Sequence, residues 1–374
     1  MKASQVPRVA TGEVIAYRLF DLAYAVDLPG AEAIWRARPG ADSARKRLSA
    51  TSPKAVAYDV PPVVLTLDPI TLALPDGPVV ANVSARLYDF GVLTLAMGIP
   101  ADNLSWTAFS DLVNMVNRVV GSDADHPVWT TLTGHLRNLL GDALERPTQS
   151  ALEEDYLLGL VRSFDRPITA AEIQEQLDLI PLLSGERLAL SEGARQDLLR
   201  KRFSYYTDDL VVLTWDRAFI YEPRGDSDVI DVLEVANAQL LEMRYYDELL
   251  DDELPRMYDL VETTRRTSSI LSSHRFAGLA RRLYTLVAEV TELTEKVDNA
   301  LQVTEDVYLA RIYTAALDLF RVQMVSTAVD RKLAIIRDTY AALYEEASGG
   351  RAAAMELTVV VLILAEIVLA VLRP

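Results

Sequence analysis

The residues best placed to do chemistry form two adjacent blocks of opposite charge. Residues 226–262 hold twelve acidic and two basic side chains, and residues 263–288 hold five arginines and no acid. Such blocks can neutralise each other within a hairpin or between subunits, and we predict this pairing. The alternative is a patch that grips phosphate or anionic lipid. Its members are Arg265, Arg266, Arg275, Arg281 and Arg282.

Two further clusters have cation-binding residue types. One is "SDADHPVWTTLTGH", and its candidate ligands are Asp123, Asp125, His126 and His135. Because nine residues separate the histidines and the aspartates adjoin a proline, we predict a capping loop before a helix rather than a metal site. The other is the acidic run "DELLDDEL", residues 247–254. Its i, i+4 spacing predicts a solvated helix face rather than a divalent-ion site.

Motifs for catalysis are missing from the sequence. It has no cysteine, so a thiol nucleophile is excluded. It also lacks the patterns GxxxxGK[ST], GxGxxG, HExxH and GxSxG, which mark phosphate loops, dinucleotide folds, zinc helices and nucleophile elbows. We therefore predict no enzyme activity, no cofactor, no metal and no small-molecule substrate.

The chain ends in an apolar run with two glutamates, "AAAMELTVVVLILAEIVLAVLRP". A helix over 352–372 would be about 31 Å long, which matches a hydrocarbon core of about 30 Å. Its twelve Leu, Ile and Val residues outweigh the cost of one partly snorkelled glutamate. We predict a transmembrane helix, with a buried helix of a soluble oligomer as the alternative. Its marker residues are Glu356, Leu357, Leu362, Glu366 and Leu372.

The other end of the chain sets the expected location. The start, "MKASQVPRVATGEVIAYRLF", has neither the apolar core nor the cleavage site of a secretory signal. We therefore predict a tail anchor with a single span in the bacterial inner (cytoplasmic) membrane. Residues 1–351 would then lie in the cytoplasm.

The first 225 residues have the composition of a mixed sheet module. Strand-like segments rich in β-branched and aromatic residues occupy 13–30, 63–80, 81–100 and 208–225. Residues 18–21 and 86–89 share the pattern Arg-Leu-aromatic-Asp, which suggests duplicated halves. Segments 104–120 and 126–145 have helical periodicity. Trp215, in the last hairpin, is expected in the core or covering the sheet.

Residues 226–350 read as long helices. The full chain has a net charge of −17, which argues against a protein that coats nucleic acid non-specifically. Within the helices, apolar residues spaced by four and three form a narrow stripe, interrupted by Thr294. A stripe this narrow predicts a hairpin or coiled coil that associates with a second copy. The residues of this oligomer seam are Leu283, Val287, Val290, Val297 and Leu301.

The C-terminal half resembles the "required for meiotic nuclear division" protein family of bacteria and mitochondria. The resemblance rests on "TEDVYLARIY", "VDRKLAIIRDTYAALYEE" and the glutamates of the tail, and it covers roughly residues 200–374. It implies an α+β N-terminal region, helical hairpins and a C-terminal transmembrane helix. It also implies large assemblies, which in mitochondria support translation of membrane proteins. The Ala- and Arg-rich composition is typical of a bacterial source.

Together these features predict an α+β fold: a mixed sheet module (1–225), a long antiparallel helical hairpin or coiled coil (226–350) and one transmembrane helix (352–372). The predicted function is a membrane-tethered, self-associating scaffold, linked by the resemblance to translation of membrane proteins. The alternative is a ribosome- or RNA-associated tether that uses the arginine block.

The RNA alternative makes a direct prediction. If the block binds phosphate, replacing four of its arginines by glutamine should abolish salt-sensitive binding of RNA. Each arginine that contacts a phosphate releases counterions from the RNA, whereas glutamine does not. The substitutions are Arg265→Gln, Arg266→Gln, Arg281→Gln and Arg282→Gln. Filter binding at two salt concentrations measures the effect. Binding that is absent, or that does not weaken with salt, would exclude the tether.

Overall fold

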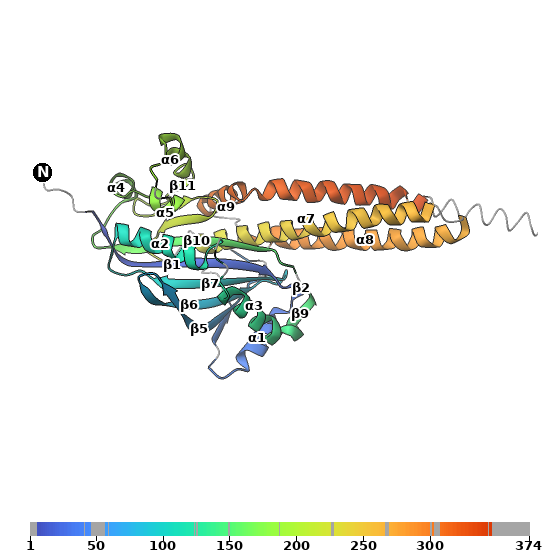
Figure 1. The fold of residues 1–374 in the computed structure, drawn as a ribbon, viewed down its shortest axis with the longest axis horizontal. Coiled ribbons are helices and arrows are strands. Elements are labelled where there is room, and N and C mark those ends of the chain that lie inside the picture. Colours follow the sequence, from blue (N-terminus) through green and yellow to red (C-terminus); the bar gives the residue numbers. More distant parts are fainter. Residues whose placement is uncertain are drawn as a thin grey trace, which may run out of the picture. The chain divides into compact units, whose positions relative to one another are not determined.

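A computed structural model describes residues 6–345, apart from 41, 46–56, 59, 123, 125, 149, 187, 226–227, 266–268, 300, 303–306 and 343. The chain divides into two compact units (Figure 1). Unit 1 comprises Met1–Glu242 and Lys296–Gln323, and unit 2 comprises Met243–Glu295 and Met324–Pro374. In their described residues, unit 1 is α+β and unit 2 is helical.

Unit 1 is built on a ten-stranded sheet. In spatial order its strands are β11 (Arg202–Phe203), β12 (Leu210–Leu213), β13 (Arg217–Tyr221), β10 (Glu153–Phe164), β1 (Arg8–Asp21), β7 (Val92–Pro100), β6 (Gly77–Leu87), β5 (Val63–Leu74) and β3 (Asp42–Arg45). The tenth strand, β8 (Leu104–Ser105), pairs with β1. Among the described strands of this sheet, only β10 and β13 pair in parallel. Two small ladders join β2 (Ala23–Val26) to β9 (Leu144–Pro147) and β4 (Ala57–Tyr58) to β14 (Leu301–Gln302).

One face of the sheet carries the larger apolar core, because alternate strand residues such as Ala16, Leu95 and Phe219 point to the same side. The helices of this region are α1 (Leu28–Arg36), α2 (Trp106–Val120), α3 (Val128–Leu139), η1 (Gly141–Ala143), α4 (Ala170–Gln176), α5 (Ile180–Ser184) and α6 (Glu192–Leu198). Helices α1 to α5 contribute buried side chains to the core. The Ser105 hydroxyl starts α2 by accepting a hydrogen bond from the Ala108 N–H at 3.2 Å.

The opposite face of the sheet is covered by the first part of α7 (Val229–Arg265) and by α9 (Val307–Leu319). Tyr156 of β10 packs against Phe320, with ring centroids 5.3 Å apart. Arg86 of β6 lies on this face, with its Nη1 atom 2.9 Å from Asp231 Oδ1 and 2.8 Å from Glu234 Oε2.

These two carboxylates need their arginine because both are almost fully buried, with 2% and 3% of their side chains exposed. The Tyr88 hydroxyl donates a further hydrogen bond to Glu234 Oε1 at 2.9 Å. Burial raises the pKa of Glu234, and the positive charge of Arg86 opposes that rise. We call Arg86, Tyr88, Asp231 and Glu234 the ionic anchor of α7.

Unit 2 contains the second part of α7, most of α8 (Ser269–Asn299) and helical residues between 324 and 342. These segments lie side by side in Figure 1. Lys332 Nζ lies 2.6 Å from Asp247 Oδ1 and 2.7 Å from Asp251 Oδ1, so part of the acidic run of α7 is paired across helices. The apolar centre of unit 2 consists of Tyr246, Leu250, Met257, Leu283, Val290, Val329, Leu333 and Ile336.

The predicted fold class requires a correction in its last element. Among the residues that the structure describes, no helix is both long enough and apolar enough to cross a membrane. Helices α7 and α8 have the length, but charged side chains occur along both. Residues 352–372, with Glu356, Leu357, Leu362, Glu366 and Leu372, lie outside the described part. The tail anchor and the inner-membrane location depended on that span, so both predictions are corrected with it.

The four-residue match between 18–21 and 86–89 does not place equivalent side chains alike. Arg18 is opposite Leu95 of β7, whereas Arg86 is opposite the next residue, Thr94. Neighbouring residues of a strand point to opposite faces, so the two arginines lie on opposite faces of the sheet. The duplication of the two halves therefore stays a prediction.

The ionic anchor gives the first stability prediction. Arg86→Met leaves two buried carboxylates without their counter-charge and should lower the free energy of unfolding by about 3–5 kcal/mol at pH 7. The loss should be smaller at pH 5 than at pH 7, because burial raises the pKa of Glu234 and protonation of its carboxylate reduces the need for a cation. Urea unfolding at both pH values measures it, with Arg8→Met, at an exposed arginine, as the control. A loss below about 1 kcal/mol at pH 7 would contradict the anchor.

Asp21, the last residue of β1, gives a pH prediction. Burial raises its pKa to about 6, although the Thr148 hydroxyl and Arg137 lower it. The native state therefore holds the proton more tightly than the unfolded state, and stability should fall as the pH rises from about 4 to about 6. Asp21→Asn should remove this loss, with a gain on the order of 2–3 kcal/mol at pH 8 and much less at pH 4.5. Equal effects at both pH values, or the same profile in the exposed control Asp142→Asn, would refute it.

Candidate functional site

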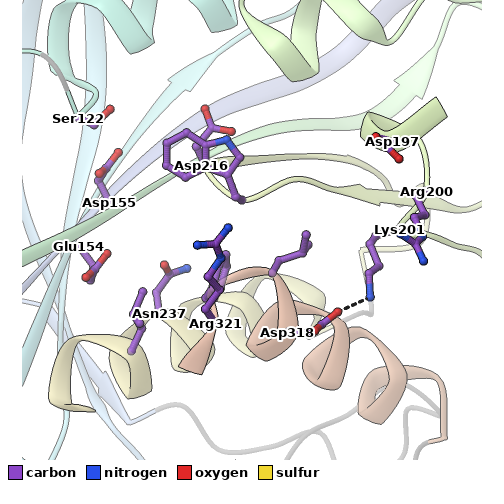
Figure 2. Close-up of a pocket in the computed structure, with 14 residues that line it drawn as sticks. Ser122, Glu154, Asp155, Asp197, Arg200, Lys201, Asp216, Asn237, Asp318 and Arg321 are labelled. Carbon is purple, nitrogen blue, oxygen red and sulfur yellow. Dashed lines mark hydrogen bonds and ion pairs between the residues drawn. The ribbon is translucent and has the colours of Figure 1, made fainter. Parts of the chain in front are cut away.

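Unit 1 contains a cavity with a volume of about 780 Å³ where β10 begins (Figure 2). It is lined by Ser122, Glu154, Asp155, Asp197, Arg200, Lys201, Trp215, Asp216, Asn237, Leu240, Asp318, Leu319, Phe320 and Arg321. These residues come from the loop after α2, β10, the end of α6 and the residues that follow it, the β12–β13 turn, α7 and the end of α9. The cavity therefore depends on segments that are far apart in the sequence.

The β12–β13 turn holds Trp215 at the cavity in an exposed position. The Thr214 hydroxyl donates to Asp216 Oδ1 at 3.0 Å, and the Arg217 Nε–H donates to Asp216 Oδ2 at 2.9 Å. The buried Tyr156 hydroxyl bridges the carbonyls of Thr214 and Arg217 from below. Trp215 is nevertheless 71% exposed, so the expectation that it lies in the core or covers the sheet is wrong.

Arg321 occupies the other side of the cavity in a strained conformation. It follows the end of α9 with a φ of +57°, a left-handed geometry that costs a non-glycine residue about 1–2 kcal/mol. The preceding residue, Phe320, is fixed by its contact with Tyr156. The exposed guanidinium of Arg321 projects into the cavity in Figure 2. Strained backbone of this kind concentrates at functional sites.

The charged groups of the cavity are mixed, because the side that carries Arg200 and Lys201 also carries two aspartates. Glu154 and Asp155 lie on one side in Figure 2, and Arg200 and Lys201 lie on the other, with Arg321 between them. Lys201 Nζ contacts Asp318 Oδ2 at 2.6 Å, and this hydrogen bond lowers the pKa of Asp318. The cavity thus offers both cations and hydrogen-bond acceptors to a ligand.

The predicted oligomer seam lies partly inside unit 2. Leu283 and Val290 are buried within the single chain, and Val287 is half-buried. The side chains of Val297 and Leu301 lie outside the described residues. Two seam positions therefore already have apolar partners without a second copy.

The arginine block is described only in part. Arg282 Nη2 lies 3.2 Å from Glu253 Oε2 of α7, and Arg281 is exposed on α8. The side chains of Arg265, Arg266 and Arg275 lie outside the described residues. In the capping loop, His126 Nδ1 accepts a hydrogen bond from the Val128 N–H at 3.3 Å, whereas Asp123 and Asp125 lie outside the described part.

Sequence reasoning missed a group of tyrosines on unit 2. Tyr284 of α8 contacts Tyr340 with ring centroids 5.9 Å apart, and Tyr340 contacts Tyr344 at 6.1 Å. Tyr284 is 62% exposed and Tyr344 is 61% exposed. We call these three residues the tyrosine patch. The i, i+4 spacing of Tyr340 and Tyr344 was the available signal.

Comparisons with known proteins identify the sheet unit. The uncharacterized protein MJ0711 of Methanocaldococcus jannaschii is 25% identical over 221 residues, which cover 59% of this chain and 66% of that protein. The match therefore spans slightly less than two thirds of the relative's length. No solved structure matches the chain. These findings do not bear on the resemblance to the meiotic nuclear division family, which stays a prediction.

A family model described as "Uncharacterized protein MJ0711, N-terminal domain" matches residues 11–228. This stretch contains the ten-stranded sheet except for the first three residues of β1, together with the cavity residues from Ser122 to Asp216. It ends where α7 begins. Because the match covers more than half of its residues, the chain belongs to the MJ0711 N-terminal domain family.

Proposed function

We propose that this protein is a self-associating scaffold, in which unit 2 joins copies of the chain and unit 1 is the module that is presented. The observation that carries the proposal is the tyrosine patch. Tyrosine and arginine are enriched at the energetic centres of protein interfaces, since both bring large contact areas and hydrogen-bonding groups. Tyr284 and Tyr344 leave most of their side-chain surface to solvent in the single chain.

The surroundings of the patch fit a second copy as the partner. Arg281 lies one helical turn before Tyr284, and the exposed Arg337 lies one turn before Tyr340. The second part of α7 exposes acids, including Asp251 and Asp252, whose side chains are 63% and 69% exposed. Each copy therefore carries both a basic, tyrosine-rich surface and an acidic surface. A two-fold dimer would use each complementary contact twice.

An RNA tether through the arginine block is the alternative function, and it has less support. The guanidinium of Arg282 already contacts the Glu253 carboxylate, and Arg256 contacts the same carboxylate at 2.8 Å. A phosphate group would have to compete with Glu253 for Arg282. The link to translation stays a prediction from the family resemblance.

Self-association through the tyrosine patch is tested by Tyr284→Ser combined with Tyr344→Ser. The double variant should shift the mass in solution toward the monomer, with Kd raised by roughly 30-fold or more, because interface tyrosines commonly contribute about 2 kcal/mol. Light scattering after size-exclusion chromatography measures the mass across a concentration series. The control is Leu188→Ser, at a residue of unit 1 that is also highly exposed.

Two outcomes would contradict this proposal. A wild-type chain that is monomeric at all concentrations would remove self-association altogether. An oligomer whose mass does not change in the double variant would remove the tyrosine patch as its contact.

A further inference from the structure

We propose that the cavity of unit 1 binds a nucleotide, with the base against Trp215 and the phosphate held by Arg321 and Arg200. This inference assigns a ligand to a site for which the sequence motifs predicted no small molecule. It does not depend on self-association, because every lining residue of the cavity belongs to unit 1.

The size and composition of the cavity suit a ligand of this class. Its volume of about 780 Å³ falls within the range of 300–1,000 Å³ that is typical of small-molecule sites. A nucleotide has three chemically distinct parts: a flat ring system, a sugar with hydroxyl donors and an anionic phosphate. Each part has a counterpart among the side chains at the cavity.

Trp215 supplies the surface for the ring. An indole that is 71% exposed loses the apolar contacts that normally bury tryptophan, and stacking on a base would restore them. Its turn is held by the Thr214, Asp216 and Tyr156 hydrogen bonds. The site for the ring is therefore in place before the ligand arrives, which reduces the entropy lost on binding.

Arg321 supplies the main cation for the phosphate. Glycine would adopt this left-handed backbone without cost. The arginine thus stands at a position where its backbone conformation destabilises the fold. Guanidinium groups bind phosphate oxygens in a bidentate manner. Arg200 is also exposed, whereas Lys201 is engaged by Asp318 and acts as a secondary charge.

The acids on the other side of the cavity favour a nucleotide over a bare anion. Glu154 and Asp155 would repel free phosphate, but carboxylates accept hydrogen bonds from ribose hydroxyls and from the amino groups of bases. Asn237, which is buried on α7, donates its side-chain N–H to the Leu233 carbonyl at 2.9 Å, so the group that it offers at the cavity is its Oδ1 acceptor. A ligand that combines hydrogen-bond donors with an anionic group therefore matches this mixed lining better than a free anion does.

The experiment titrates the purified full chain with ATP, GTP, CTP, UTP, their monophosphates and inorganic phosphate. The other three tryptophans, Trp35, Trp106 and Trp129, are buried, so quenching of the exposed indole reports on the cavity. At least one nucleotide should quench this fluorescence with saturation, and calorimetry should give the same Kd. Inorganic phosphate should bind at least 10-fold more weakly.

Variants separate a binding role from a structural one. Arg321→Gly should weaken binding by about 10-fold or more while the melting temperature stays equal or rises, because glycine relieves the strain. Trp215→Ala should weaken binding by about 5- to 100-fold in calorimetry. The control is Arg195→Gln, which removes a half-buried arginine of α6 that pairs with Asp178 outside this cavity and should leave Kd unchanged.

Three outcomes would overturn the proposal: no saturable binding of any nucleotide at millimolar concentration, equal Kd values for wild type, Arg321→Gly and Trp215→Ala, or phosphate binding as tightly as nucleotides. The Tyr284→Ser and Tyr344→Ser double variant should bind the nucleotide as the wild type does. Failure of self-association can therefore be distinguished from failure of this site.

Discussion

The arrangement of unit 1 depends on a buried cluster of charged side chains, although the burial of charge is costly for stability. Arg86, Asp231 and Glu234 give up hydration to meet between β6 and the first turns of α7, a cost that their mutual attraction offsets only in good geometry. Apolar residues would have packed there with less risk. The value of the cluster is specificity, because only one rotation and one axial position of α7 brings both carboxylates onto Arg86. The anchor therefore sets where the later residues of α7 lie within unit 1, as far as Glu242.

The cavity follows from that position of α7. Asn237 comes one turn after Glu234 on the same helix, so the anchor that holds Glu234 also places Asn237 at the cavity. On the other side, Tyr156 ties two parts of the wall together. Its hydroxyl supports the turn that carries Trp215, and its ring packs against Phe320, the neighbour of Arg321. Two solvent-exposed side chains thus rest on a rigid, buried support, which is the usual arrangement of a binding site.

Sequence patterns predicted which segments of unit 1 form strands and helices better than they predicted which strands pair. The segments 13–30, 63–80, 81–100 and 208–225 contain β5, β7, β12 and β13 and overlap β1 and β6, and the periodic stretches 104–120 and 126–145 contain α2 and α3. The central strand β10 was not recognised. Its parallel pairing with β13 joins residues about sixty positions apart, and such contacts leave no local signal. The exposure of Trp215 was missed for another reason: residue type indicates burial only on average.

The helical unit shows what an apolar stripe can and cannot specify. A spacing of four and three residues states that one face of a helix is buried, but it does not state whether the covering surface belongs to the same chain or to another. In unit 2, Leu283 and Val290 are covered by the chain's own helices. A contact between copies must then use residues other than these two. Large side chains that remain exposed beside a filled stripe are the natural candidates, and Tyr284, directly after Leu283, is one of them.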